Sequence, residues 1–494
     1  MFLKNEQESP TTITKQEIYE ICDSGRENTV LFIQLLLHKI ATLEKKIEEQ
    51  DKQIQHFRDI TSKDSHNSSK PPSSDGYKKK TVIKSLRKKS TKKSGGQNGH
   101  PGTNLTMSFN PDKTEPLKVH ICNNCGSNEH LKIIGHKCRQ VVDVEIKKIV
   151  TEFKADIVEC GGCGNITTAT FPEKVTQDVQ YGPLVKAIII YMRNLNYMPT
   201  DRLTEMFEDV FHIPLSEGTI YNTTQKYSRL LKPFDDYVRQ KLIKSPIVHF
   251  DETGIRIENS LHWLQCSSTS LYTFYFPHQR RGKIAMDEMG ILPFFTGTAI
   301  HDSYASYFEY ECFHGLCNSH HLRELIFLHE EMAQVWAKKM IDLLLEIKEK
   351  TEKAKLNAKT IPKNLMIYYE KRYKRILYDG FKANPEIIDE KKGRGRKKKG
   401  KVLCLLVRLK TRLRHVLAFM YDVLVPFDNN QVERDIRMAK LYQKISGCFR
   451  TMEGAIDFFR IRSFISTIRK HKIDVISALK ILYETDNFYE ILAE

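Results

Sequence analysis

The sequence predicts a mixed α/β core that carries a large all-α insertion and follows several smaller N-terminal modules. Two observations predict the core. Short apolar runs stop at carboxylates, Asp251 and Asp302, and a long charged helical interval then separates them from a third acidic residue, Glu433. The N-terminal modules are predicted by a heptad repeat and by two C-x2-C pairs.

The composition argues against a membrane protein and favours one that binds nucleic acid. The 494 residues suffice for several domains of roughly 100–200 residues each. Mean hydropathy is −0.45, and no apolar run approaches the ~18–20 residues of a membrane-spanning helix. The start lacks a signal-peptide pattern, so we expect a cytoplasmic, nucleoid-associated protein with reduced cysteines. The net charge of +17 predicts a polyanionic partner, although a merely basic soluble protein would share it.

Much of the positive charge lies in two segments that are too polar to form a core. Eleven Lys or Arg fall between Lys63 and Lys93, in a Ser-, Pro- and Gly-rich stretch that we interpret as a basic linker over residues 61–115. The second segment, KKGRGRKKKGK, spans Lys391 to Lys401. Both segments would contact DNA phosphates without reading bases, or would simply be solvated. The candidate DNA-binding residues here are Lys88, Lys89, Lys397 and Lys398.

Residues 28–60 carry a heptad repeat of apolar residues. Ile at one seam position and Leu at the other favour a two-stranded parallel coiled coil, and Gln50 would help to fix its register. We therefore predict a dimerisation helix; the alternative is an amphipathic helix that packs on its own chain. The seam consists of Ile33, Leu36, Ile40, Leu43, Ile47, Gln50, Ile54 and Phe57.

Two C-x2-C pairs predict a four-cysteine structural zinc site within residues 116–175. Each pair forms a turn that directs two thiolates at one point, and two such turns complete a tetrahedral zinc site. The strand-like alternation between the pairs is typical of a zinc ribbon. His120, His136 and Cys138 are alternative ligands. The four predicted ligands are Cys122, Cys125, Cys160 and Cys163.

Residues 180–240 have a helical pattern. DRLTEMFEDVF and SEGTIYNTTQKYSRLL are joined by HIPL, and Ser216 is a suitable N-cap for the second helix. This is helix-turn-helix geometry, in which the second helix enters a DNA major groove. Two packed helices with no role in DNA binding give the same pattern, so both interpretations stay open.

Residues 244–321 predict the first part of a ribonuclease H-like core. An apolar strand stops at Asp251, two further strands and a helix follow, and a fourth strand stops at Asp302. In a ribonuclease H-like fold the first and fourth strands are neighbours, so the two carboxylates would face each other across a metal ion. An ordinary strand-to-loop exit also ends in such residues, and a pair of acids binds metal poorly, so a third acid is required.

The third acid is predicted within residues 426–470, in FDNNQVERDIRMAKLYQKISG. Asp428 or Asn429 would cap a helix whose first turns contain Glu433. Helical spacing places four more polar residues on the same face as Glu433. The acid would hold a metal ion and the bases would hold phosphates; the alternative is a solvated polar face. The four residues are Asn430, Arg437, Lys440 and Lys444.

With these motifs the chain resembles transposases of the insertion sequence 66 family, within the DDE superfamily. The matching stretches extend over most of the chain from about residue 30, and they are specific only in combination. They are NSSKPPSSDG, GGQNGHPG, the paired C-x2-C, HFDETGIRI, LHWL, RRGKIAMDEMGILPFFTG, HDSYASYF, CNSHHLREL, DNNQVERDIRMAKLYQKISGCFRT and RIRSFISTIRKHKIDVISAL.

The resemblance implies a DDE triad of Asp251, Asp302 and Glu433, a helical insertion over residues 322–425 and a helical tail over 471–494. Cys317 and His320 match a C-x2-H signature that would support the catalytic loop or ligate metal. The implied activity is cleavage of double-stranded DNA at the terminal inverted repeats of the element, followed by transfer of the 3′-hydroxyl into target DNA.

The three acids predict two-metal-ion catalysis with Mg²⁺ or Mn²⁺, since hydrolysis and in-line transesterification need an activated nucleophile and a stabilised leaving oxygen. We expect a homodimer or higher oligomer, with accessory proteins of the same element as further partners. The alternatives are a catalytically inactive, zinc-dependent DNA-binding repressor and a ribonuclease H-like nuclease without strand transfer.

Overall fold

The structure is a computed structural model that describes residues 14–61, 105–129, 131–385 and 400–492. Lys88, Lys89, Lys397 and Lys398 lie outside these residues. The chain divides into two compact units. One comprises Met1–Thr81 and Asn318–Leu424, and the other comprises Val82–Cys317 and Val425–Glu494.

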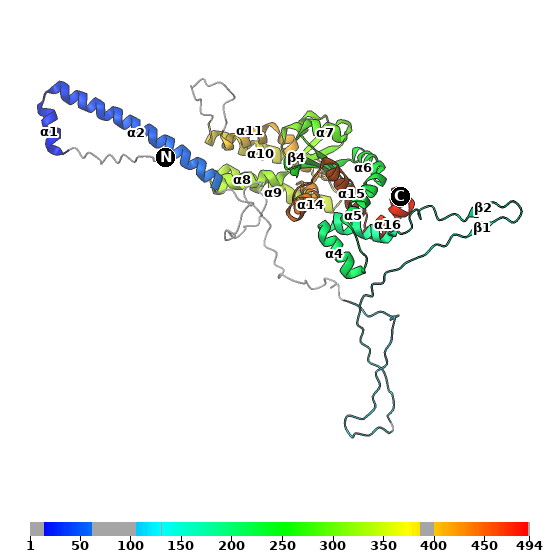
Figure 1. Ribbon diagram of the computed structural model, residues 1–494. Helices are drawn as coiled ribbons and strands as arrows, with labels where there is room; N and C mark the ends of the chain where they lie inside the picture. Colours follow the sequence, from blue (N-terminus) through cyan, green and yellow to red (C-terminus); the bar gives the residue numbers. More distant parts are fainter. Residues whose placement is uncertain (1–13, 62–104, 130, 386–399, 493–494) are drawn as a thin grey trace. The chain divides into compact units, whose positions relative to one another are not determined.

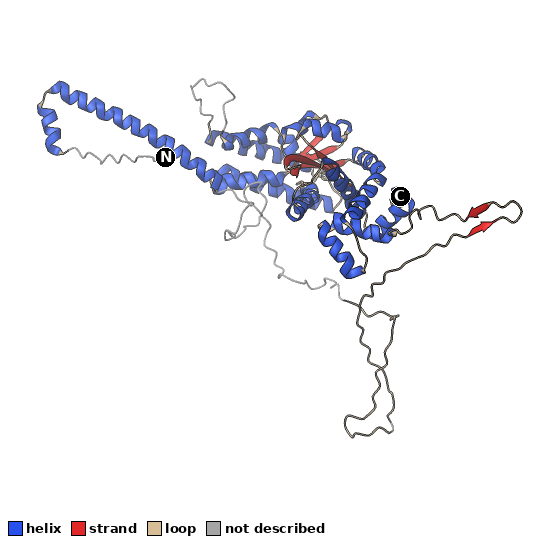
Figure 2. Cartoon of the chain, in the orientation of Figure 1, coloured by secondary structure: helices blue, strands red, loops and turns tan. Residues whose placement is uncertain are grey.

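A five-stranded sheet forms the centre of the second unit (Figure 2). Its strand order is β5-β4-β3-β6-β7. The first three strands along the chain form an antiparallel meander, and β6 then pairs in parallel with β3 on the other side. The strands are β3 (Ile247–Ile257), β4 (Ser260–Ser268), β5 (Thr273–His278), β6 (Thr298–His301) and β7 (Phe313–Leu316).

The first strand does not end at Asp251, as the sequence suggested, but continues to Ile257. Its second half pairs with β4, from Asp251 opposite Cys266 to Ile257 opposite Ser260, and this pairing satisfies the backbone groups that a loop would expose. Asp251 therefore lies inside the sheet, at the level where the pairing with β6 stops.

Both faces of the sheet are covered, as is typical of a sheet that contains parallel strand pairs. Val248 and Phe250 of β3 belong to a core cluster with residues of the helices after and before the sheet. Ile255 and Ile257 point to the opposite face of β3, and they belong to a second cluster with residues of helix α14. The surrounding helices are α6 (Lys232–Ile243), α7 (Lys283–Met289), α14 (Asn430–Ser446), α15 (Met452–Lys470) and α16 (Val475–Thr485). Short helical turns are η3 (Leu292–Phe294), η4 (Ala305–Glu309) and η5 (Phe488–Glu490).

Helices α3 (Pro183–Ile190), α4 (Thr200–Phe211) and α5 (Glu217–Leu230) precede the sheet, with the π-helical turn η2 (Tyr191–Leu195) after α3. Ser216 caps α5, because its hydroxyl accepts a hydrogen bond from the backbone N–H of Thr219 at 3.1 Å. One face of α5, with Ile220 and Tyr227, is buried in the unit. Tyr221 lies on the remaining surface, 49% exposed, so this helix retains a face that could contact a partner.

The segment with the C-x2-C pairs contains only a short hairpin among its described residues, β1 (Ile157–Glu159) and β2 (Ile166–Thr168), both labelled in Figure 1. The longer alternating stretch before Ile157 has no assigned strand, although its pattern predicted one. Large apolar side chains throughout the segment stay exposed, including Val119, Ile134, Val141 and Val179. The described residues of this segment therefore bury no core of their own.

The other unit contains two N-terminal helices and a helical interval where the insertion was predicted. Its interval is all helix in the described residues and packs around Trp336, Leu344 and Tyr373. No helix in the part of the chain that the structure describes is long and apolar enough to cross a membrane. The helices are α1 (Lys15–Asp23), α2 (Arg26–Thr61), α8 (Asn318–Glu330), α9 (Val335–Leu356), α10 (Lys363–Ala383), α11 (Lys401–Thr411), α12 (Leu413–Val416) and α13 (Ala418–Tyr421).

Helix α2 carries the heptad residues along one unbroken helix. Their apolar side chains are exposed, with Ile40 at 50%, Leu43 at 53% and Ile47 at 57%. An apolar stripe of this kind on a single chain is typical of a coiled-coil partner surface, so dimerisation stays a prediction.

Candidate active site

The register of the sheet brings two of the predicted acids to the same level. In the parallel pair β3–β6, His249 lies opposite Ile300. Asp251 and Asp302 each follow two residues later, so they lie side by side where β6 ends. Asp302 accepts a hydrogen bond on Oδ1 from the backbone N–H of Tyr304 at 2.9 Å, which fixes the turn after the strand.

The third predicted acid comes from the helix that covers this face of the sheet. Asp251 points to the same face of β3 as Ile255 and Ile257, because side chains two residues apart in a strand share a face. Ile255 and Ile257 pack against Val432 and Ile436 of α14. Glu433 is in the first turn of α14, with its side chain 12% exposed. The sequence therefore folds so that β3, the end of β6 and the start of α14 direct carboxylates towards one region.

Asn429, at the N-cap of α14, joins the helix to the strand. Its side-chain amide donates to the carbonyl of Phe250 at 2.8 Å, and its Oδ1 lies 2.8 Å from Nδ1 of His249. Its backbone N–H donates to Sγ of Cys317 at 3.3 Å. Asn429 is 2% exposed, so these bonds are shielded from water, and they fix the position of Glu433 against β3.

The electrostatics of the site show that these carboxylates lie close together. Burial, followed by the charges of Glu252, Asp302 and Glu433, raises the pKa of Asp251 well above its usual range. Burial and the charge of Asp302 likewise raise the pKa of Glu252. Like charges that are held together away from water disfavour ionisation unless a cation neutralises them. This donor set therefore fits a divalent cation with oxygen ligands.

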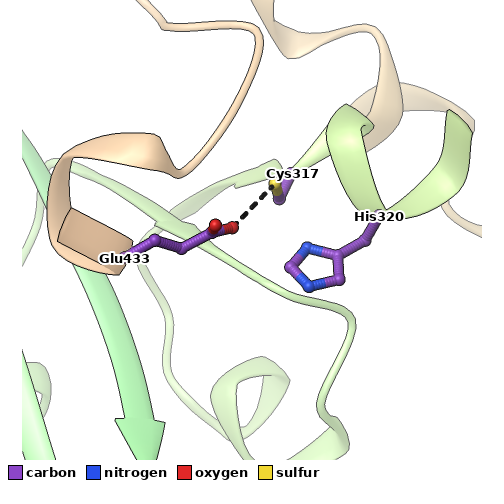
Figure 3. A group of neighbouring side chains, drawn as sticks. All are labelled: Cys317, His320 and Glu433. Atoms are coloured by element: carbon purple, nitrogen blue, oxygen red, sulfur yellow. Dashed lines mark hydrogen bonds between the residues drawn. The ribbon is translucent and has the colours of Figure 1, made fainter. Parts of the chain in front are cut away.

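A second grouping of ligand atoms shares Glu433 (Figure 3). Sγ of Cys317 lies 3.9 Å from Oε1 of Glu433. His320 follows in the first turn of α8, and the ligand atoms of the three side chains all lie within 4.8 Å of one another. Cys317 is 1% exposed. Sequence reasoning had named Cys317 and His320 as supporting residues but had not predicted that both approach the third acid.

The basic residues predicted beside Glu433 differ in their surroundings. Arg437 is 66% exposed and lies 3.6 Å from Glu433. Lys440 bends back to the sheet, where its ammonium bonds the carbonyl of Gly254, and burial lowers its pKa. Lys444 and Asn430 are exposed. Arg437 and Lys444 are therefore accessible to a phosphate backbone, whereas Lys440 is already bonded to β3.

Sequence reasoning gave no role to Glu252, which lies on the opposite side of β3 from Asp251 and is buried. Its carboxylate accepts hydrogen bonds from Arg281 and from Tyr307. The sequence did contain a signal for this. Because side chains alternate along a strand, the residue after Asp251 points to the opposite face of the sheet, and a carboxylate buried there needs a hydrogen-bond donor or a positive charge as its partner.

Each C-x2-C pair forms a tight turn. The N–H of Gly126 donates to the carbonyl of Cys122, and the N–H of Gly164 donates to that of Cys160. Backbone N–H groups of the same turns lower the pKa of Cys122 and of Cys160, which favours the thiolate that binds metal. Among the described residues, the structure does not bring the two pairs into one ligand group.

Comparison with known families identifies the protein at the family level. The Transposase IS66 family matches residues 178–457, more than half of the chain, including all three acids. The chain belongs to this family. The resemblance inferred from the sequence motifs is thereby confirmed, and with it a transposase role that includes DNA binding.

A separate family of unknown function (DUF6444) matches residues 17–106 of this IS66-family chain, a range that includes α2. No curated protein matches the chain. The family match ends before α16 and begins after the cysteine-rich segment, so the parts outside it are described by their own residues.

Proposed function

We propose that this chain is a DDE-type transposase that cleaves DNA at the ends of its element and transfers the 3′-hydroxyl into target DNA. The observation that carries this proposal is the placement of Asp251 on β3, Asp302 just after β6 and Glu433 in the first turn of α14, near enough for the charges of Asp302 and Glu433 to raise the pKa of Asp251. Three carboxylate side chains, together with the scissile phosphate, are adequate ligands for metal-dependent phosphodiester chemistry.

The fold supports the same proposal. A meander of three antiparallel strands whose first strand then pairs in parallel with the fourth is the order expected of a ribonuclease H-like core. We assign that fold to residues 244–321 together with 426–470, and we assign the helices from α8 to α13 to the insertion. In this arrangement β3 carries the first acid, the second acid follows the neighbouring strand β6, and α14, which packs on β3 and β4, carries the third.

The three acids fit Mg²⁺ or Mn²⁺, which would activate the attacking hydroxyl and stabilise the leaving oxygen. The residues of the chain fix where this can occur. Asn429 holds the start of α14 on β3, and the turn at Tyr304 holds Asp302, so the carboxylates are positioned before DNA arrives. Arg437 and Lys444 would bind nearby phosphates.

The remaining DNA contacts of the proposal come from segments of high positive charge. Lys88, Lys89, Lys397 and Lys398 would bind the backbone, and α5 would read a groove with its exposed face. A repressor that has lost catalysis would keep such contacts but would not need two acids whose charges raise the pKa of a third, Asp251. A nuclease without strand transfer would not need a dimerisation helix.

A mobility assay tests the proposal. A marker flanked by the DNA that borders this gene would be placed in a bacterial host, and either the wild-type protein or the Glu433→Gln variant would be supplied separately. We expect integration with the wild type and at least a roughly 10³-fold loss with the variant, because a metal ligand is removed while the shape is kept. Equal integration with both proteins would contradict the assignment of Glu433. Absence of integration even with the neighbouring reading frames added would contradict the transposase activity.

The exposed seam of α2 predicts a dimer in solution. Replacing Ile40 and Ile47 with Asp would place unpaired carboxylates in the seam, and we expect the dimer dissociation constant to rise by at least about 100-fold. Analytical ultracentrifugation measures this directly. Lys45→Asp, on the outer face of the same helix, is the matched control and should leave the dimer intact. A dimer that persists in the double variant would rule out α2 as the interface.

A further inference from the structure

A buried carboxylate next to Asp251 organises a group of side chains that the three-acid site does not explain. The side chain of Glu252 is 1% exposed. Its Oε1 accepts hydrogen bonds from Nε and Nη2 of Arg281, at 2.9 and 2.6 Å, and its Oε2 accepts one from the hydroxyl of Tyr307 at 2.6 Å. Both carboxylate oxygens are thus occupied by donors from segments beyond β3.

The guanidinium of Arg281 also lies over two aromatic rings. It is 4.7 Å from the ring centre of Trp263 and 4.2 Å from that of Tyr304. These two ring contacts, together with two hydrogen bonds to one carboxylate, restrict the orientation of this side chain. Neutralising Glu252 alone would not require the rings.

The backbone around Arg281 is built for this approach. Gly282 has φ +89°, and a Cβ there would lie 3.0 Å from both the Tyr304 hydroxyl and the Ser306 hydroxyl. Glycine is therefore needed for the loop before α7 to reach the segment that follows Asp302. The RRGK, LHWL and HDSYASYF motifs, which are far apart in sequence, meet at this point.

Arg281 lies beside the acid cluster. The backbone N–H of Tyr304, whose ring covers the guanidinium, donates to Asp302. Burial alone would lower the pKa of Arg281, but the hydrogen bond and charge of Glu252, followed by Tyr304 and Asp302, raise it. The side chain remains 37% exposed, and within the described residues its Nη1 makes no hydrogen bond. The guanidinium is thus held by Glu252 and the two rings, keeps a donor at Nη1 that is free among the residues that the structure describes, and belongs to a side chain that is partly exposed.

We propose that Arg281 binds a phosphate of the DNA backbone next to the scissile bond, with Glu252, Trp263 and Tyr304 as positioning residues that fix its orientation. This inference rests on the proposed function. A planar guanidinium with preset donors suits the oxygens of a phosphodiester better than a mobile lysine does. The DNA would thereby be placed in register with Asp251 and Asp302.

The test uses the full-length protein and a duplex containing the DNA that borders this gene, in Ca²⁺ so that binding is measured without turnover. Single phosphates would be replaced, one at a time, by uncharged methylphosphonates. For the wild type we expect one position near the cleavage site to weaken binding by roughly ten- to a hundredfold. Arg281→Gln should bind the unmodified duplex more weakly than the wild type by a similar factor. The methylphosphonate that weakens wild-type binding should not weaken the binding of this variant any further.

Two further variants keep this result interpretable. Arg281→Lys retains the charge opposite Glu252 but not the guanidinium fork, and it should fold normally and bind with an intermediate loss. Arg460→Lys is the matched control, since Arg460 forms a half-buried pair with Asp235 at 2.7 Å on α6 and α15. It should keep wild-type sensitivity at every methylphosphonate.

The inference is overturned if Arg281→Gln shows the wild-type pattern, or if no methylphosphonate weakens wild-type binding. Failure of the proposed function would be distinct from either result. It would appear as an absence of cleavage by the wild type on the same duplex in Mg²⁺, whatever the methylphosphonate pattern shows.

Discussion

Replacing Asp251 with asparagine should abolish Mg²⁺-dependent DNA cleavage and, in the absence of metal, raise the free energy of unfolding. Both effects have one cause. The folded protein holds Asp251 near Glu252, Asp302 and Glu433, a repulsive arrangement that only a cation relieves. Cleavage should fall by about 10³-fold or more, because a ligand of the reacting metal is lost. Binding of the DNA ends should remain.

Metal titration separates this explanation from a general loss of structure. Mg²⁺ at about 100 times its dissociation constant would raise the free energy of unfolding of the wild type by about 2.7 kcal/mol. Asp251→Asn should gain much less. Asp235→Asn is the control, since Asp235 already has Arg460 as its partner at 2.7 Å and its replacement removes the carboxylate of that ion pair. The control should lose stability and keep its response to Mg²⁺. A metal-free Asp251→Asn protein that is less stable than the wild type would contradict the repulsion.

The same cause predicts how stability depends on pH. Burial and the neighbouring charges raise the pKa of Asp251 above its ordinary value of 3.8. As pH rises through 3.8, the carboxyl ionises in the unfolded chain while the folded chain keeps the proton. The folded state then binds more protons, so the free energy of unfolding decreases with pH until the folded-state pKa is passed. Chemical denaturation of the metal-free protein at several pH values should show this decrease, and Asp251→Asn should reduce it.

The positions of the three acids were predictable because they depend on periodicity. An apolar run of strand length placed Asp251, a second run placed Asp302, and helical spacing placed Glu433 in the first turn of a helix. The pairing of β3 with β6 could be inferred from strand order alone. The continuation of β3 beyond Asp251 could not, since it depends on β4 returning along the same strand.

The residues that support the acids could not be predicted, because their partners are distant in sequence. Asn429 was expected only to cap its helix, yet it bonds the backbone of Phe250 and the ring of His249. Glu252 was given no role from the sequence, because its partners Arg281 and Tyr307 lie on segments that only the fold brings to it. Lys440 was expected to face phosphates but bonds the carbonyl of Gly254, because that carbonyl lies beside α14. The spacing of residues along a helix or strand shows which of them share a face, but it does not show which other parts of the chain pack against that face.

The cysteine-rich segment leads to the second large effect, a dependence of its folding on zinc. In the structure this segment has one short hairpin and many exposed apolar side chains, so burial alone does not hold it together. Its two C-x2-C turns already favour thiolates. We expect the protein stripped of metal to bind about one Zn²⁺ per chain through Cys122, Cys125, Cys160 and Cys163, with an apparent free energy on the order of 10 kcal/mol.

Hydrogen exchange of residues 116–175 measures this ordering, which should appear on addition of Zn²⁺ and not on addition of Mg²⁺. Cys160→Ser should remove the protection, whereas Cys404→Ser, an exposed cysteine of α11, should not. If Cys138→Ser loses zinc, Cys138 is itself a zinc ligand and takes the place of one of the four cysteines assigned here. Protection that is independent of zinc, or equally lost in Cys404→Ser, would contradict a zinc-stapled module. Asp251, Asp302 and Glu433 belong to the sheet and α14 and not to this segment. Adding Zn²⁺ should therefore order the segment without restoring DNA cleavage, and cleavage should return only when Mg²⁺ is added.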